Sequence, residues 1–298
     1  MALTACNTTV GSDGRELLDH GTTSFPVACY EDDFRITDVP WHWHEEWEAV
    51  LITQGSCLVA AGNHKAHLHT GEGFFVHSGA LHGCWDTEDS GCRFHSLVFH
   101  PRLVGGSLDS IFHQEFVQPL LDHTGPELIL LKSDTPWQKQ ALEALEDAWQ
   151  QCVREDAGFP FRVRNALSEL VWLLRCHLSP AAASVSSKDL RDAQRIKAML
   201  TCIHSQYGSE LSTAVIAASA SVSESECLRC FRSTIGTTPI QYLKQYRIQQ
   251  AAHLLKETPE KVSEIASRCG FQDMSYFTKV FREVFGCVPT EYRKNASP

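Results

Sequence analysis

Apolar and polar positions follow two different spacing patterns, one in the N-terminal part of the chain and one farther along. From residue 47 to residue 99, apolar residues form short runs that turn residues separate, such as the pair Gln54-Gly55. Short runs at close intervals are typical of antiparallel strands that build a sandwich or a barrel. The predicted strands are Trp47–Thr53, Cys57–Ala61, Gly73–His77 and Arg93–Phe99.

Farther along, the spacing of apolar residues becomes helical. Apolar residues recur every three or four positions from Trp137 to Cys152 and from Val163 to Leu174, a spacing that forms one apolar stripe along a helix. Gly158-Phe159-Pro160 interrupts this pattern, so two separate helices are predicted. The segment 179–187 is small, polar and nearly uncharged, which is typical of a linker. Helical periodicity resumes at Leu190 and continues to the end.

These spacing patterns predict an α+β chain made of an antiparallel β-barrel, a helical pair and an all-helical C-terminal domain. With 298 residues, 43% of them hydrophobic and 21% charged, the chain has the composition of a folded, soluble protein. No stretch approaches the roughly 20 apolar residues that span a bilayer, and the polar start does not resemble a signal peptide, so we expect a cytoplasmic protein. The expected regions are a sensor-like domain at 1–108, a helical segment at 109–178, a linker at 179–189 and a helical domain at 190–298.

A repeat with an offset of fifty residues runs through the helical C-terminal part. Four landmark residues, Phe, Gly, Pro and Tyr, recur in the same order at this offset, which chance rarely produces. In each copy a short apolar helix is followed by a turn and a second helix, so the pattern predicts two helix-turn-helix units. The predicted helices are Leu211–Ser219 and Ser223–Thr234, then Lys261–Arg268 and Asp273–Phe285, and the landmarks are Phe231, Gly236, Pro239 and Tyr242, then Phe281, Gly286, Pro289 and Tyr292.

The second helix of each unit is predicted to present a polar outer face. Hydroxyl groups and cations on such a face can bond to base edges or phosphates of double-stranded DNA, whereas the plainer alternative is a pair of solvated helical hairpins. Glu224 and Glu226 repel phosphate, so we expect the first unit to bind less tightly or more selectively. The expected DNA-contacting residues are Ser225, Leu228, Arg229 and Arg232 in the first unit, and Met274, Ser275, Tyr276, Lys279 and Arg282 in the second.

The charge of the chain is distributed unevenly. The whole chain carries a net charge of −10, which argues against nucleic acid at first sight. Residues 188–298, however, hold 15 Lys and Arg against 11 Asp and Glu, a net charge of +4, which leaves −14 on residues 1–187. The basic charge therefore lies where the repeat lies, although a charge of +4 alone would decide little.

The C-terminal landmarks resemble the signature of the AraC family of bacterial transcription regulators. The resemblance covers about a hundred residues. It implies that two recognition helices enter successive major-groove segments, about 34 Å apart, and it makes Arg229 and Lys279 the best candidates for contact with the groove. The residues that carry it are Pro239, Tyr242-Leu243, Arg247, Ala251 and Leu255, then Gly270-Phe271, Ser275-Tyr276-Phe277, Phe281, Phe285-Gly286, Pro289 and Tyr292-Arg293.

The segment 41–48, with the sequence WHWHEEWE, carries the densest chemistry of the N-terminal part. Alternate residues of a strand share a face, so His42, His44, Glu46 and Glu48 are predicted on one side. The second signal is GEGFFVHSGALH at 71–82, which ends in His82.

The spacing of these residues resembles both motifs of the cupin barrel. In cupins the matching positions bind a divalent metal, and three imidazoles with one carboxylate suit Zn, Fe, Mn, Ni or Cu. The alternative is that these polar groups hold a ligand, or each other, without a metal. The motif residues are His42, His44 and Glu48, then Gly55, Gly79 and His82, whereas His77 stands where the family usually has proline.

Aromatic residues flank the histidine-rich segment. They are either the core and rim of the barrel or the walls of a pocket for a small-molecule effector, because such pockets combine apolar walls with a few polar groups. The candidate effector pocket consists of Trp43, Glu46, Phe75 and Trp85.

Two hypotheses for the function follow. The first is a ligand-responsive transcription regulator, in which the resemblance implies that the helical segment at 109–178 forms a homodimer interface. The second is a metal-dependent cupin enzyme, an isomerase or dioxygenase, with an accessory helical domain. The predicted DNA-binding repeat favours the first hypothesis.

Overall fold

The computed structural model describes residues 8, 10–11, 14–35, 39–62, 64–86, 90–122, 126–178 and 187–296. It forms two compact regions, an N-terminal one that consists mainly of Arg15–Ala193 and a C-terminal one that consists mainly of Gln194–Pro298. Of the expected linker at 179–189, residues 179–186 lie outside the described residues. Within the described residues, no helix has both the length and the apolar character needed to cross a membrane.

The N-terminal region contains two antiparallel β-sheets, which confirms the predicted fold class. The larger sheet has the strand order β1-β8-β3-β6-β9, and the smaller has the order β2-β7-β4-β5. The predicted strands recur as β3, β4, β6 and β8, with boundaries that differ by a residue or less. The strands are β1 Val27–Asp33, β2 Val39–His42, β3 Trp47–Gln54, β4 Ser56–Ala61, β5 His64–His69, β6 Gly73–Val76, β7 His82–Trp85, β8 Arg93–Phe99 and β9 Leu128–Leu131.

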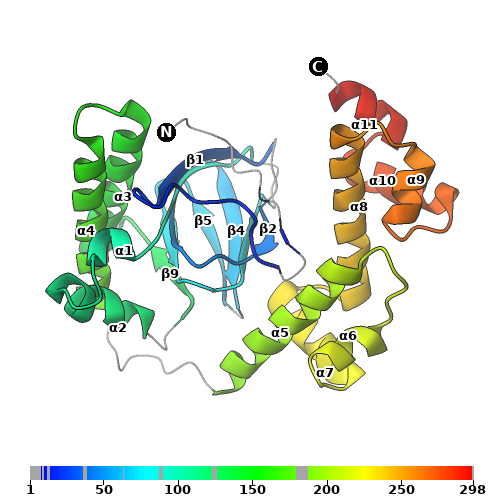
Figure 1. The fold of residues 1–298 in the computed structure, drawn as a ribbon, viewed down its shortest axis with the longest axis horizontal. Coiled ribbons are helices and arrows are strands. Elements are labelled where there is room, and N and C mark those ends of the chain that lie inside the picture. Colours follow the sequence, from blue (N-terminus) through cyan, green and yellow to red (C-terminus); the bar gives the residue numbers. More distant parts are fainter. Residues whose placement is uncertain are drawn as a thin grey trace. The chain divides into compact units, whose positions relative to one another are not determined.

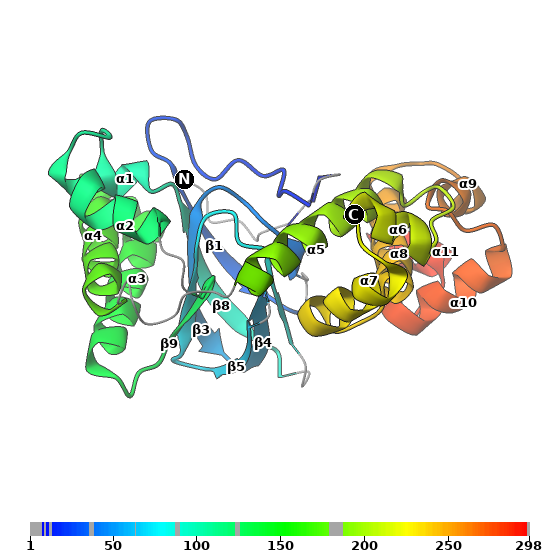
Figure 2. The same ribbon diagram turned by 90° about the horizontal axis from the view of Figure 1, so that it is seen from below.

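Alternation along the strands of the larger sheet produces two separate cores. In β3, Val50 and Ile52 pack between the two sheets, whereas Trp47 and Ala49 face the other way. That outer face is covered by the two predicted amphipathic helices: the first lies against the sheet and the second packs against the first, as Figure 1 and Figure 2 show. The helices of this region are α1 Arg102–Gly105, the π-helical turn η1 His113–Val117, α2 Gln118–Leu121, α3 Pro136–Arg154 and α4 Phe159–His177.

The break between α3 and α4 has a local cause. Gly158, at φ +82°, precedes the first residue of α4 in a left-handed conformation that side chains other than glycine adopt at a cost. Pro160 lies in the first turn of α4, where its missing N–H removes no helical hydrogen bond. The Gly-Phe-Pro signal therefore starts the second helix rather than merely ending the first.

The C-terminal region is entirely helical in its described part and contains the two predicted helix-turn-helix units. Helix α8 connects them: Figure 1 shows α6 and α7 at one end of α8 and α9, α10 and α11 at the other. The helices are α5 Ser187–Gln206, α6 Thr213–Ser219, α7 Glu224–Cys230 with the π-helical turn η2 Phe231–Ile235, α8 Pro239–Glu257, α9 Val262–Arg268, α10 Met274–Phe285 and α11 Pro289–Ala296.

Both units use the same turn. Ser221, at φ +55°, and Gly270, at φ +79°, adopt the left-handed conformation, and their N–H groups donate to carbonyl groups three residues back. The N–H group of the residue after Ser221 donates to the carbonyl oxygen of Ala217, and that of the residue after Gly270 donates to the carbonyl oxygen of Ala266. These two acceptors stand 49 positions apart. The residues that cap the following helices, Ser223 and Asp273, stand 50 positions apart. The second turn is therefore one residue longer than the first, although the hydrogen bonds match.

Candidate functional site

Four of the predicted site residues converge between the two sheets. His42 ends β2, Glu48 lies in β3 and His82 begins β7, while His44 comes from the turn between β2 and β3. Their potential ligand atoms all lie within 4.8 Å of one another, and all four residues are buried. The prediction that one strand aligns them was wrong, because the strand pattern stops at His42. Glu46 lies in that turn and is not a member of the cluster.

Backbone carbonyl groups fix the orientation of the three imidazole rings. Each ring donates a hydrogen bond from Nδ1–H, which leaves its Nε2 directed toward the other members of the cluster. His82 Nε2 lies 2.8 Å from Glu48 Oε2, and His44 Nε2 lies 3.6 Å from the same oxygen. Within the described part of the chain, His44 Nε2 is buried without a hydrogen-bond partner. The accepting oxygens are those of Pro40 at 2.8 Å from His42, Glu46 at 3.1 Å from His44 and Ala80 at 2.9 Å from His82.

The electrostatics of the cluster keep its acid charged and one of its bases neutral. Burial, reinforced by the nearby His82 ring, lowers the pKa of His42 to about 3. Burial raises the pKa of Glu48, but its contacts with His44 and His82 outweigh burial and hold that pKa well below its usual value. Three imidazole nitrogens and one carboxylate therefore meet in a buried space, and these are the donor types that bind a divalent transition metal.

The predicted effector-pocket residues are not gathered in one place. Trp85 is half-buried with its ring 5.2 Å from that of Trp41, and Trp43 is half-buried beneath the Arg15 guanidinium. Phe75 packs with Trp47 in the core under the helices, on the opposite face of the larger sheet from Glu48. Its inclusion among the pocket residues is corrected by the alternation of β6, because only Phe74 and Val76 face the space between the sheets.

Two residues that the sequence analysis did not select lie beside the cluster. Glu16 is buried, and its Oε2 lies 3.8 Å from His42 Nε2 and 3.0 Å from His20 Nε2. Burial raises the pKa of Glu16, but the hydrogen bond with His20 and the nearby His42 ring lower it to about 2. The segment has no regular periodicity, so only the spacing Glu-x-x-x-His could have indicated a pair.

In the second helix-turn-helix unit, every predicted DNA-contacting residue is exposed. Helix α10 starts after Asp273, whose carboxylate accepts hydrogen bonds from the N–H groups of Ser275 and Tyr276. This cap directs the first turn of α10 outward, and the Tyr276 side chain is about half exposed. The exposed residues are Met274, Ser275, Tyr276, Lys279 and Arg282.

In the first unit, the outer face is only partly available. Ser225 and Arg232 are exposed, but Leu228 and Arg229 are half-buried. Arg229 donates two hydrogen bonds to Glu226, from Nε at 2.9 Å and from Nη2 at 2.8 Å. The same Glu226 accepts a hydrogen bond from Arg195 of α5 at 3.0 Å. The best groove candidate of the first unit is therefore engaged in an ion pair on its own helix.

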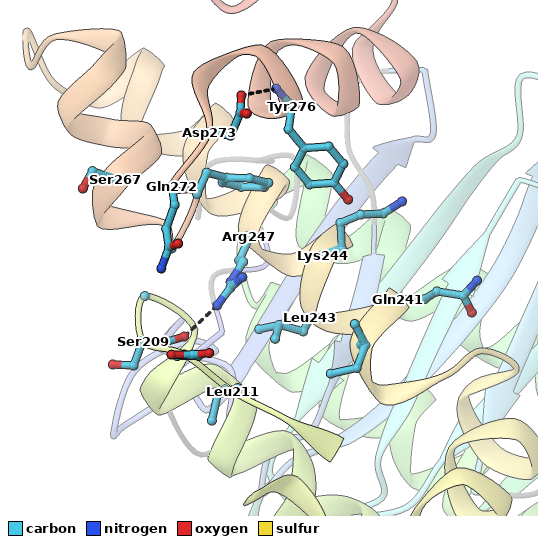
Figure 3. Close-up of a pocket in the computed structure, with 15 residues that line it drawn as sticks. Ser209, Leu211, Gln241, Leu243, Lys244, Arg247, Ser267, Gln272, Asp273 and Tyr276 are labelled. Atoms are coloured by element: carbon cyan, nitrogen blue, oxygen red, sulfur yellow. Dashed lines mark hydrogen bonds between the residues drawn. The ribbon is translucent and has the colours of Figure 1, made fainter. Parts of the chain in front are cut away.

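A groove of about 730 Å³ separates the two units, and Figure 3 shows its lining. Arg247 of α8 lies at its base and donates hydrogen bonds to the carbonyl oxygens of Tyr207 and Ser209, both at 2.7 Å. The guanidinium also packs against Gly270, where an added Cβ would come within 2.8 Å of it and of the Tyr207 oxygen. The turn of the second unit is thus held against the segment that leads into the first.

Two family models match the chain, one for each region. An AraC-like ligand-binding domain matches residues 24–171, and a helix-turn-helix domain matches residues 216–295. The first contains the histidine cluster and the second contains both outer faces, of α7 and of α10.

Similar proteins extend along nearly the whole chain. The HTH-type transcriptional regulator YdeC of Bacillus subtilis is 29% identical over 97% of this chain and 98% of its own length. The HTH-type transcriptional activator RhaR of Mannheimia succiniciproducens is 24% identical over 85% of this chain and 87% of its own length. Among solved structures, ToxT from Vibrio cholerae is 14% identical over 93% of this chain and 99% of that one, with a TM-score of 0.43.

The relatives are transcription regulators rather than enzymes, in agreement with the first of the two hypotheses. The two family models cover the sheets with their helices and both helix-turn-helix units. The chain therefore belongs to the AraC family of transcription regulators, with an AraC-like ligand-binding domain followed by a helix-turn-helix DNA-binding domain.

Proposed function

We propose that this regulator binds a divalent transition-metal ion between its two sheets, and that the ion changes its affinity for DNA. The ligands are His42, His44, Glu48 and His82. The observation that carries the proposal is the convergence of three Nε2 atoms on one buried carboxylate, with every Nδ1 held by a carbonyl oxygen. A metal cation would supply a partner for His44 Nε2, which has no hydrogen-bond partner among the described residues.

We also propose that DNA is contacted by the outer faces of α7 and α10, and that the region 1–108 senses the ion or an effector. The exposure of the predicted residues of α10 supports this role for the second unit. The aromatic residues Trp43 and Trp85, half-buried in the same region as the metal ligands, are candidates for contact with a small-molecule effector. Occupancy of the metal site shifts DNA affinity only to the extent that the ion binds the DNA-bound form more tightly.

The active form is proposed to be a homodimer that is formed through α4. Phe161 and Trp172 are 67% and 46% exposed, and eleven residues of helix place them on the same face. Large apolar side chains in solvent are a liability for a monomer and are common at interfaces. The helical segment at 109–178 would then be the dimerisation region. Light scattering should give the mass of a dimer for the wild type and of a monomer for Trp172→Arg.

Elemental analysis of the full chain, purified without added ions, tests the metal site. We expect about one equivalent of a transition metal in the wild type and its loss in His44→Ala. The matched control is His67→Ala, because His67 is an exposed histidine of β5 and its removal should leave the metal content unchanged. A wild-type protein without metal, which also takes up none on dialysis against Zn²⁺ or Mn²⁺, would contradict the proposal.

DNA affinity measured with and without the ion tests the coupling. A fragment selected from random sequences by the wild-type chain serves as the probe. We expect chelation to change its Kd by about fivefold or more, within the usual 1–3 kcal/mol of coupling between two sites. An equal Kd in both conditions would leave a metal site without a sensing role.

A further inference from the structure

We propose that Glu16 supplies a second carboxylate to the metal site, and that His20 positions it there. The inference rests on the proposed metal centre. It adds a ligand from the N-terminal segment, which lies outside the two motifs that indicated the other four.

The burial and position of Glu16 support this role. Glu16 is 5% exposed, and its Oε2 lies 3.8 Å from His42 Nε2. Atoms that bind one metal ion at about 2.1 Å lie roughly 3 to 4 Å apart, so the separation from His42 suits two ligands of one ion, although Glu16 stands outside the four residues whose ligand atoms all lie within 4.8 Å of one another. The corresponding distance between His44 and Glu48 is 3.6 Å. The distance between the Glu16 carboxylate and His42 is therefore similar to that between the Glu48 carboxylate and His44.

The backbone holds this segment against the cluster. The N–H of Glu16 donates to the carbonyl oxygen of Trp43 at 2.9 Å, and Arg15 forms an isolated parallel bridge with Trp43. Because Trp43 lies between His42 and His44, the segment that carries Glu16 is attached beside two of the metal ligands.

His20 has the geometry of a positioning residue. Its Nε2 lies 3.0 Å from Glu16 Oε2, and its Nδ1 lies 3.0 Å from the hydroxyl group of Tyr30. When the Tyr30 hydroxyl donates to Nδ1, the Nε2–H donates to Glu16, so one neutral tautomer satisfies both contacts. His20 and Tyr30 are both buried, which restricts the carboxylate to one orientation.

The charge of the cavity gives the second line of support. Glu16 and Glu48 place two carboxylates in a buried space, which costs several kcal/mol for each unless a cation compensates. A divalent ion carries the charge that balances both.

Titration of the metal-free full chain with Co²⁺, followed by calorimetry and by visible absorption, tests the assignment. Glu16→Gln keeps the shape of the side chain and removes its charge. We expect its Kd for Co²⁺ to rise by about 10- to 100-fold, and the d–d absorption to gain intensity as one ligand is lost. The matched control is Glu45→Gln, because Glu45 is an exposed neighbour that pairs with Arg15, and it should bind Co²⁺ within about twofold of the wild type.

The outcomes separate this inference from the metal site itself. If Glu48→Gln abolishes Co²⁺ binding but Glu16→Gln matches the wild type in Kd and spectrum, Glu16 is not a ligand and the metal centre stands. If the wild type binds no Co²⁺, both proposals fail. Glu16→Asp keeps a carboxylate on a shorter side chain and serves if Glu16→Gln does not fold, as judged by circular dichroism. A wild-type Kd and spectrum in Glu16→Asp would likewise overturn the assignment.

Discussion

The two helix-turn-helix units share a backbone design but differ in how their outer helices are engaged. Both turns place one residue in the left-handed conformation, with matching hydrogen bonds. In the second unit, however, α10 runs for 12 residues and presents Lys279 and Arg282 to solvent. In the first, α7 has 7 residues before it widens into η2, and its Arg229 is bound to Glu226.

From this difference we expect the two units to contribute differently to the proposed DNA binding. A cation that faces solvent contacts DNA at little cost, whereas a paired cation must first give up its partner. The second unit should therefore supply most of the affinity. The first should respond more strongly to the base sequence, because only a site that offers Arg229 a better partner than Glu226 will engage it.

Gly270→Ala should have the largest effect. A methyl group there meets both a left-handed backbone and atoms at 2.8 Å, so we expect a loss of about 2–4 kcal/mol in the free energy of unfolding of the C-terminal region. Calorimetry of the full chain would measure it. The control is Gly286→Ala, at φ +72° with open space around it, which should cost only about 1 kcal/mol. Equal losses in the free energy of unfolding would show that the close contact between Gly270 and Arg247 does not contribute to the effect.

Lys279→Ala compared with Arg229→Ala tests the expected difference between the units directly. We expect Lys279→Ala to weaken binding to the selected DNA by about 10- to 100-fold, the usual cost of one groove contact. Arg229→Ala should cost less than about threefold, because its ion pair already offsets much of any contact with DNA. Fluorescence anisotropy would measure both. A loss for Arg229→Ala as large as that for Lys279→Ala would remove the distinction between the units.

Glu226→Gln should sharpen the comparison. Releasing Arg229 lets it reach a phosphate, so affinity for unrelated DNA should rise by about threefold to tenfold and the salt dependence should steepen by about one charge. Glu224→Gln is the matched control, because Glu224 is exposed and pairs with no arginine in the described residues. If both variants raise affinity equally, net charge alone explains the change.

Ser221→Gly should have the smallest effect. The left-handed conformation of Ser221 costs about 1 kcal/mol that glycine avoids, partly offset by the greater freedom of glycine in the unfolded chain. We expect a gain of about 0.5 kcal/mol by calorimetry. Ala220→Gly, at φ −105°, lacks this strain and should destabilise instead. A loss in Ser221→Gly would mean that the serine side chain contributes more than its strain costs.

The sequence predicted the elements and motifs well and the contacts between side chains less well. The spacing of Phe, Gly, Pro and Tyr indicated both helix-turn-helix units, because that spacing is set by local backbone geometry. The spacing of Glu16 and His20 could have indicated a pair, but their place beside the cluster could not be foreseen, since they reach it from an irregular segment through long-range contacts. The pairing of Arg229 with Glu226 could have been noted from the i, i+3 spacing, but its strength depends on Arg195 in another helix.

The length of helix α8 determines both the distance between the two helix-turn-helix units and their relative rotation. Its 19 residues span about 28 Å, comparable to the pitch of one turn of B-form DNA. Each residue added to a helix also turns everything beyond it by about 100°. A single alanine inserted into α8 would therefore rotate one helix-turn-helix unit away from the duplex while barely lengthening the protein. With both units bound to DNA as proposed, the residue count of α8 would set the angular offset between the two halves of a target site.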